Sequence, residues 1–271
     1  MRHPLRRIFV AAVLLAAAHT SLAQTPKTVL LQELTWTELR DQIQAGKTTI
    51  IIPIGGTEQS GPDVALGKHN ARAAWLSQRI AEGLGNALVA PVIAYVPEGS
   101  YAPPTAHMRF PGTITIPDDV FEKMLESAAN SFAVHGFRNI VFLGDHGGYQ
   151  KDLQQVVARL NKTWAHSAAR AFVPPEYYGA SSDGYAQMLR QQGYRDDEIG
   201  THAGLADTSL QLAVAPQMVR LDRLHSGAKL GPVDGVYGGD PRRSSAALGR
   251  TGIDAIVSRT VDAIMKDTAG R

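Results

Sequence analysis

Short apolar runs alternate along this chain with longer segments in which apolar residues recur at helical spacing. The runs 49–54 and 139–143 are almost continuously apolar, which is typical of strands buried on both faces. The segments 70–84 and 117–136 instead carry apolar residues near every third or fourth position and predict helices. This alternation predicts an α/β protein whose mostly parallel sheet is covered by helices on both faces.

The rest of the chain continues the same pattern. Further strands are predicted over 86–95, where Pro91 limits regular pairing, and over 169–173. Further helices are predicted over 151–164, 207–214 and 250–266. Three long stretches, at 97–111, 173–201 and 227–239, are predicted to be irregular. Loops of such length in a compact domain are frequently functional.

The first residues have the composition of an export signal rather than of a folded segment. Basic residues within Arg2–Arg7 precede the apolar run Ile8–Ala18, and Ser21–Ala23 has the small-x-small form of a cleavage site. The run is too short to span a bilayer, which takes about 20 apolar residues. We therefore predict a signal peptide over 1–23 and a periplasmic protein. The adjacent Arg6 and Arg7 leave general secretion and twin-arginine export both open.

The predicted mature chain is a single domain over residues 24–271 with little net charge. Removing residues 1–23 takes away three of the 27 basic residues and none of the 25 acidic ones, which leaves a net charge of −1. No basic excess remains to bind nucleic acid, and no membrane anchor is predicted. The chain has no cysteine, so any metal must be held by His, Asp or Glu.

Two glycine-rich runs, Gly55–Pro62 and Gly144–Tyr149, follow the two central strands and each carries a candidate metal ligand. Sites in open α/β sheets form beyond the carboxyl ends of the strands. Glu58, His146 and His69, which lies eleven residues after Glu58, form a ligand set typical of catalytic zinc. We predict one divalent ion there, with zinc preferred over manganese or iron. Each run alone is equally well explained as an ordinary solvated turn.

A third run, Thr201–Ser209, carries the candidate catalytic residues His202 and Asp207. A histidine beside a metal site can protonate a leaving nitrogen, so we assign His202 to proton transfer. Asp207 begins a predicted helix, and a role as the helix cap is its alternative explanation. The isolated histidines receive no role: His135, His166 and His225.

Several blocks of sequence resemble the creatininase family of metal-dependent amidohydrolases. In the order in which that family has them, the blocks are Pro53–Leu66, Phe110–Ile114, Asp145–Gly148, His202–Ser209 and Gly235–Pro241. The resemblance extends over about residues 30–265. It implies a three-layer α/β/α fold with a mostly parallel central sheet, and a homo-oligomer, frequently a hexamer.

Three departures from the family pattern bear on the metal. Ser60 stands where many members have a metal-binding histidine, and His69 stands where they have a bridging aspartate. Gly148 stands where creatininase itself has a further carboxylate. An imidazole does not bridge two ions as a carboxylate does. We therefore expect one metal ion rather than two, and a substrate other than creatinine.

Other polar residues in these blocks are weaker candidates for contacts with the substrate or with the metal ligands. Ser60 and Asp63 replace histidines of the family pattern, whereas His107 occupies the position of a frequent histidine. Asp145 immediately precedes a predicted ligand. Tyrosines of the irregular stretches and glycine runs are candidate pocket walls: Tyr101, Tyr149, Tyr177 and Tyr178.

The function predicted from these features is hydrolysis of a C–N bond in a small cyclic or linear amide, in which a metal-activated water attacks the carbonyl. Two alternatives remain. One is a lactone or small-peptide hydrolase on the same scaffold. The other is a periplasmic binding protein that kept the pocket without turnover.

Overall fold

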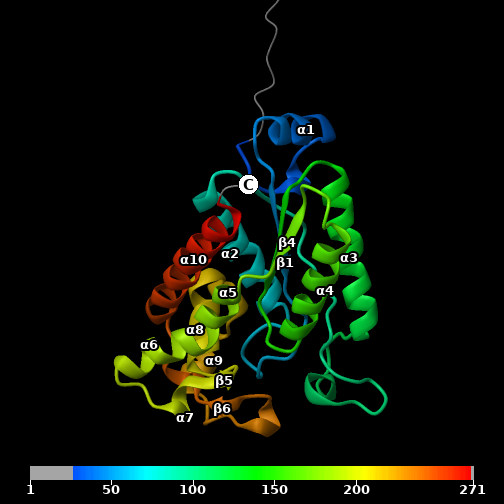
Figure 1. Cartoon of the computed structure of the whole chain (residues 1–271). Helices are drawn as coiled ribbons and strands as arrows, with labels where there is room; N and C mark the ends of the chain where they lie inside the picture. Colours follow the sequence, from blue (N-terminus) through cyan, green and yellow to red (C-terminus); the bar gives the residue numbers. More distant parts are fainter. Residues whose placement is uncertain (1–26, 270–271) are drawn as a thin grey trace, which may run out of the picture.

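The computed structural model describes residues 27–269, so the predicted signal peptide lies outside the described residues. At its centre is a sheet of four parallel strands in the order β2-β1-β3-β4 (Figure 1). Ile50 of the central strand pairs with Leu88 on one side and with Ile140 on the other. The strands are β1 (Thr49–Ile54), β2 (Ala87–Val89), β3 (Asn139–Gly144) and β4 (Arg170–Phe172).

Helices cover both faces of the sheet and complete three layers, which confirms the predicted α/β fold (Figure 1). The main ones are α1 (Trp36–Gln44), α2 (Lys68–Leu84), α3 (Asp118–Val134), α4 (Gln150–Thr163), α8 (Leu205–Val214) and α10 (Ala246–Thr268). Helices α3 and α4 pack on one face, and α2, α8 and α10 on the other. Along β1, Ile50 and Ile52 belong to the α3–α4 core and Ile51 to the opposite core, as the strand period of two requires.

The sequence explains the bounds of α2, which carries several site residues. Its buried stripe of Ala73, Leu76 and Ile80 has the spacing of one helix face. The helix ends at Gly85, whose φ of 75° lies in the left-handed region that glycine adopts without strain.

The order of the strands creates a switch point beside β1. The chain passes from β1 through α2 to β2 on one side, and then through α3 to β3 on the other side. Consecutive connections therefore diverge between β1 and β3 and leave a crevice at their carboxyl ends. Glu58 follows β1 and His146 follows β3, so both lie at this crevice.

Two predictions of secondary structure need correction. The strand predicted over 86–95 is only three residues long, as β2, and Ile93 adds an isolated parallel bridge to Ile54. Pro91 interrupts the pairing because it has no N–H to donate.

The stretch 173–201, predicted to be irregular, is largely helical. It contains α5 (Pro175–Gly179), a π-helical turn (Ala180–Gly184), α6 (Tyr185–Gln191) and α7 (Asp196–Ile199). Tyr177, Tyr185 and Leu189 are buried in the core on the α10 side, so tertiary packing stabilises helices that the glycines and serines obscure in the sequence.

The end of the molecule beyond the carboxyl edge of the sheet is built from short elements. A small antiparallel sheet pairs β5 (Gly200–His202) with β6 (Tyr237–Gly239), and α9 (Leu221–Ser226) lies close by. Short 3₁₀ segments occur there at Ala106–Arg109, Pro216–Met218, Pro232–Asp234 and Pro241–Arg243, whereas a further one, Leu31–Glu33, precedes α1 at the opposite end. The segment 97–111 projects from this end as a long loop (Figure 1).

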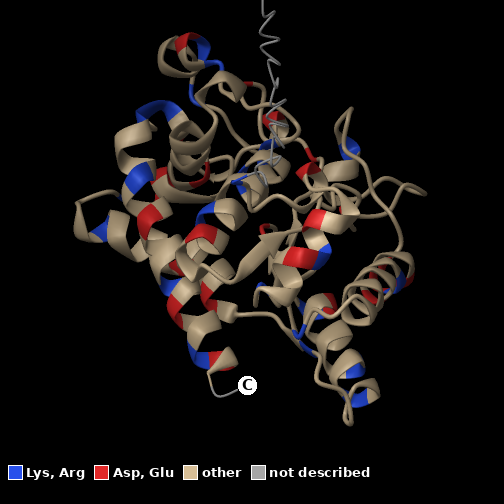
Figure 2. Ribbon diagram, turned by 90° about the horizontal axis from the view of Figure 1, so that it is seen from above, with Lys and Arg blue, Asp and Glu red and all other residues tan. Residues whose placement is uncertain are grey.

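Acidic and basic residues are interspersed over the helices (Figure 2). Within residues 27–269, no helix is both long enough and apolar enough to cross a bilayer.

Candidate metal centre and pocket

Four side chains from separate segments converge at the crevice between β1 and β3. One ligand atom from each of Glu58, Glu98, His107 and His146 lies within 4.8 Å of the others. Glu58 and His146 follow the two central strands, whereas Glu98 and His107 come from the segment between β2 and α3. Glu58 and His146 were predicted as ligands, His107 was a weaker candidate, and Glu98 was not identified from the sequence.

Buried oxygens without partners mark this group as a cation site. Glu58 Oε2 and both carboxylate oxygens of Glu98 are buried and have no hydrogen-bond partner within residues 27–269. Glu58 Oε2 lies 3.1 Å from His107 Nε2 and 3.5 Å from His146 Nε2. Buried carboxylates are costly unless they are paired or coordinate a metal. Two carboxylates and two imidazoles are donors that fit a divalent ion such as zinc, manganese or iron.

The two carboxyl groups of the centre have opposite pKa shifts. Burial and then the neighbouring Glu58 raise the pKa of Glu98 to about 9. Burial also acts to raise the pKa of Glu58, but Lys68 and His69 outweigh it and hold that pKa well below its usual value. In the metal-free protein the pair therefore keeps one proton at neutral pH, and that proton resides on Glu98.

The imidazoles of the centre are neutral at neutral pH. Burial lowers the pKa of His107, and burial together with the charges of His69 and Lys68 lowers the pKa of His146 to about 4 despite the opposing effect of Glu58. A neutral imidazole has a lone pair to give to a metal, so the protonation states also fit a ligand role.

Backbone features hold the ligands in place. Gly56 has a φ of 148°, and a Cβ at this position would lie 2.7 Å from Glu98 Oε1. Glycine therefore permits the close approach of Glu98. The buried Tyr149 hydroxyl accepts a hydrogen bond from His146 N (3.0 Å) and faces the carbonyls of Ile54 (2.9 Å) and Gly55 (2.7 Å). The fully buried Tyr149 thus holds the backbone of the turn that carries His146.

His69, which was predicted as a metal ligand, lies beside the centre between two carboxylates. Its Nε2 is 2.8 Å from Glu58 Oε1 and its Nδ1 is 2.6 Å from Asp145 Oδ2. Burial and Lys68 lower the pKa of His69, but Glu58 and the hydrogen bonds to both carboxylates prevail and raise it. Arg72 Nη2 also lies 3.1 Å from His69 Nδ1, so both ring nitrogens have protein partners in this arrangement, and the metal-ligand role of His69 stays a prediction.

Two cations extend this chain of contacts on the other side. Arg72 Nε donates to Asp145 Oδ2 (2.8 Å), and its Nη1 donates to Asp207 Oδ1 (2.7 Å). Lys68 donates to Asp207 Oδ2, and its Nζ lies 3.4 Å from Glu58 Oε1. The contacts form a closed circuit, which we call the ion-pair ring: Glu58, His69, Asp145, Arg72, Asp207 and Lys68.

The candidate catalytic residues occupy different settings. His202 Nε2 lies 3.0 Å from the carbonyl oxygen of Gln59, to which a protonated Nε2 donates, and 3.1 Å from the side-chain amide nitrogen of Gln59. Its Nδ1 lies 3.6 Å from Glu58 Oε1. Burial and the nearby Lys68 lower the pKa of His202 to about 3. Asp207 also accepts a hydrogen bond from the Ala203 N–H (3.0 Å), so it closes the turn before α8 as well as the ring.

The weaker candidates are distributed as follows. Asp145 belongs to the ion-pair ring, where it also accepts from the Tyr177 hydroxyl (3.1 Å). Ser60 is buried, and its hydroxyl has no hydrogen-bond partner in the described part of the chain. Asp63 forms an ion pair with Arg223 (3.2 Å), away from the pocket.

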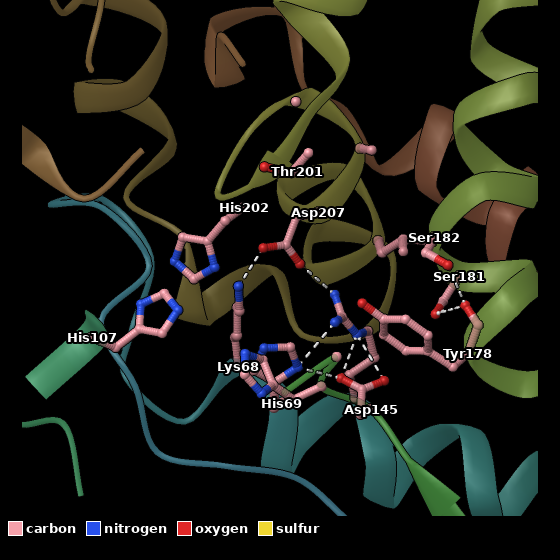
Figure 3. Close-up of a pocket in the computed structure, with 16 residues that line it drawn as sticks. Lys68, His69, His107, Asp145, Tyr178, Ser181, Ser182, Thr201, His202 and Asp207 are labelled. Carbon is pink, nitrogen blue, oxygen red and sulfur yellow. Dashed lines mark hydrogen bonds and ion pairs between the residues drawn. The ribbon is translucent and has the colours of Figure 1, made fainter. Parts of the chain in front are cut away.

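A pocket of about 230 Å³ opens over the metal centre and the ion-pair ring (Figure 3). Tyr178 and the serines of the π-helical turn line its far wall, and the Tyr178 hydroxyl makes no hydrogen bond within residues 27–269. Of the other predicted wall tyrosines, Tyr101 is exposed on the projecting loop, and Tyr149 and Tyr177 are fully buried. Polar residues that line the pocket include Lys68, Arg72, His107, His146, Tyr178, Ser181, Ser182, Thr201, His202 and Asp207.

Known proteins resemble the chain in sequence. It is 28% identical to creatinine amidohydrolase of Pseudomonas putida over 225 residues, which cover 81% of this chain and 85% of that protein. It is 27% identical to the mycofactocin precursor peptide peptidase of Mycobacterium ulcerans (strain Agy99) over 259 residues, covering 86% and 91% of the two chains.

Solved structures share the fold. A crystal structure of creatinine amidohydrolase (creatininase) matches with a TM-score of 0.74 at 23% identity, covering 91% of this chain and 100% of that one. Similar structures include a creatininase mutant described as "Zn-Zn type" (TM-score 0.73, 23% identity, 90% of this chain and 100% of that one) and a manganese creatininase (TM-score 0.73, 24% identity, with the same coverage).

The model of the creatininase family, described as creatinine amidohydrolase, matches residues 32–264. This match includes the strands of the central sheet, the four residues of the metal centre and the ion-pair ring. The chain therefore belongs to the creatininase family, whose members are metal-dependent amidohydrolases.

Proposed function

We propose that this protein is an exported hydrolase that cleaves a C–N bond in a small cyclic or linear amide. The observation that carries the proposal is the convergence of Glu58, Glu98, His107 and His146 beside a polar pocket that His107 and His146 line. These residues would hold one divalent ion, with zinc preferred. The bound ion would polarise the substrate carbonyl and lower the pKa of a water molecule bound to it.

The pocket residues supply the remaining chemistry. His202 is neutral at neutral pH, and its Nε2 proton is held by the Gln59 carbonyl, so Nδ1 is the nitrogen that accepts a proton from the attacking water. The same hydrogen bond stabilises the imidazolium that forms. His202 then returns the proton to the leaving nitrogen. The Tyr178 hydroxyl, which has no hydrogen-bond partner among the described residues, lies on the opposite wall, where it can orient a polar group of the substrate.

The size of the pocket favours a small substrate. About 230 Å³ is below the usual range of sites for drug-sized ligands, which begins near 300 Å³. A peptide substrate is the second candidate, and the similarity to the mycofactocin precursor peptide peptidase favours it. A peptide would have to present one residue to the pocket while the rest lies outside.

Metal analysis and turnover on one preparation test the proposal. The mature chain is assayed for bound metal and for hydrolysis of a panel of small amides, lactones and short peptides. We expect about one ion per chain and turnover of a C–N substrate. Turnover of lactones alone would contradict the C–N assignment, and a chain that binds no divalent ion would contradict the metal centre.

His202→Ala tests the proton-transfer role. Loss of a general acid–base group typically costs about 10²–10⁴-fold in rate. We expect a loss of kcat in this range with metal content and melting temperature retained. His225→Ala is the matched control, because His225 is exposed on α9 outside the pocket. Near-normal kcat in His202→Ala would refute the assignment.

Export and assembly are separate parts of the proposal. The predicted cleavage after Ala23 is tested by N-terminal sequencing of periplasmic protein, which we expect to begin at Gln24. Soluble protein that retains Met1 in the cytoplasm would refute it. The homo-oligomer, and the hexamer in particular, is tested by sedimentation equilibrium of the mature chain.

A further inference from the structure

Lys68 is buried in the catalytic site. Only 1% of the residue is exposed, although lysine is almost never fully buried unless it is paired. Its ammonium donates to Asp207 Oδ2 (Figure 3) and lies 3.4 Å from Glu58 Oε1. Lys68 begins α2, next to His69, so its position is fixed by the same helix that carries His69 and Arg72 of the ion-pair ring.

Glu58 has two faces that serve different cations. Its Oε2 faces the metal centre, 3.1 Å from His107 Nε2. Its Oε1 contacts His69 Nε2 at 2.8 Å and lies 3.4 Å from the Lys68 ammonium and 3.6 Å from His202 Nδ1. One carboxylate therefore separates two cation positions, and an ammonium occupies the second.

Oxygen atoms of two carboxylates flank that second position. They are Oε1 of Glu58 and Oδ2 of Asp207, and His202 Nδ1 lies 3.6 Å from the Glu58 oxygen. Carboxylate oxygens of this kind also bind divalent ions. Arg72 holds the other oxygen of Asp207 at 2.7 Å, which keeps Oδ2 turned toward Lys68.

We propose that the Lys68 ammonium takes the place of a second metal ion beside Glu58, so that the site combines one exchangeable divalent ion with one fixed positive charge. This inference rests on the metal centre proposed above. Sites with two ions hold them about 3.5–4 Å apart on shared ligands. Here Lys68 is part of the chain, so the second positive charge cannot dissociate. Its ammonium offers hydrogen-bond donors beside the pocket, where a metal ion would offer an open coordination position.

Metal stoichiometry of a Lys68 variant tests the inference. The metal-free mature chain, Lys68→Ala and the control Lys162→Ala are titrated with Zn²⁺ and examined by calorimetry and native mass spectrometry. Lys162 is exposed on α4, so its removal should change nothing. We expect one ion per chain for the parent and the control, and two ions for Lys68→Ala, because that variant vacates the position and leaves its ligands in place.

Melting temperature gives a second readout. Removing one partner from a buried ion pair leaves unpaired charge and is strongly destabilising, so metal-free Lys68→Ala should melt roughly 10 °C below the parent. Excess Zn²⁺ should raise the melting temperature of this variant by more than it raises that of the parent. Lys68→Ser is measured in parallel, because the short serine side chain also vacates the position of the ammonium but keeps one hydrogen-bond donor.

Each outcome has a distinct meaning. If the parent binds no ion, the proposed metal centre itself is wrong. If the parent binds one ion and both Lys68 variants also bind only one, the metal centre stands and the role of Lys68 is refuted. If the parent binds two ions, Lys68 does not exclude the second ion and the inference is again refuted. A second ion in either Lys68 variant supports it.

Discussion

Glu98→Gln should stabilise the metal-free protein while weakening metal binding. In the folded metal-free chain, burial and the adjacent Glu58 raise the pKa of Glu98 to about 9, against a usual value of 4.5. At pH 7 the folded state therefore holds a proton that the unfolded state has released. Because of this difference in bound protons, the folded state loses about 3 kcal/mol of stability between pH 4.5 and pH 7, at 1.36 kcal/mol for each pH unit. A glutamine side chain has nearly the same shape and does not titrate, so the variant does not lose this stability.

The sign of the pH dependence follows from the same linkage. Because the folded state binds more protons than the unfolded state, the stability of the parent protein falls as pH rises from 4.5 toward 9. The variant lacks this dependence, so its advantage should be close to zero near pH 4.5 and about 3 kcal/mol at pH 7. Metal affinity should fall at least about tenfold, since an amide replaces a charged ligand.

The assay is urea unfolding of chelator-treated protein at several pH values, with Zn²⁺ titration of the same samples. Glu176→Gln is the matched control, because Glu176 is exposed on α5. A variant that is less stable than the parent at pH 7, or whose advantage does not grow with pH, would refute the buried-acid reasoning. Unchanged Zn²⁺ affinity would remove Glu98 from the ligand set.

Three further substitutions probe the structure around the site. His146→Ala should lose most metal affinity in a Zn²⁺ titration, because it removes one of four ligands. Tyr149→Phe should lower the free energy of unfolding by about 1–3 kcal/mol in urea, since it removes the partner of the His146 N–H and of the Gly55 carbonyl. Gly249→Ala should lower it by a similar 1–3 kcal/mol, because its Cβ would overlap the Ser209 carbonyl between α10 and α8. Gly179→Ala is the control, with no atom near the new Cβ, and should be neutral or slightly stabilising in the same unfolding experiment.

The sequence predicted the central sheet because its strands are buried on both faces and therefore read as unbroken apolar runs. It also predicted the positions of Glu58 and His146, since both follow those strands directly. Glu98 also follows an apolar run, the strand predicted over 86–95, and lies three residues after its predicted end at Tyr95. It was missed because it lies in the stretch 97–111, which was predicted only as an irregular loop.

The short helices of the stretch 173–201 could not be predicted from local pattern. Gly179, Gly184 and the two serines between them weaken any helical periodicity, and the segment is ordered by packing against α10. The relation of His69 to Asp145 and Arg72 was also hidden. Asp145 lies 76 positions after His69 and 73 positions after Arg72 in the chain.

The ion-pair ring has a consequence for how the molecule folds and opens. Its members come from four segments: the turn after β1, the first turns of α2, the turn after β3 and the start of α8. Each charge is compensated only when its neighbours on both sides are in place, so no segment can dock alone without burying an uncompensated group. Closure of the ring is therefore cooperative. Amide protons of the α2 and α8 first turns should exchange with solvent as one unit, in a single opening that dismantles the site without unfolding the sheet.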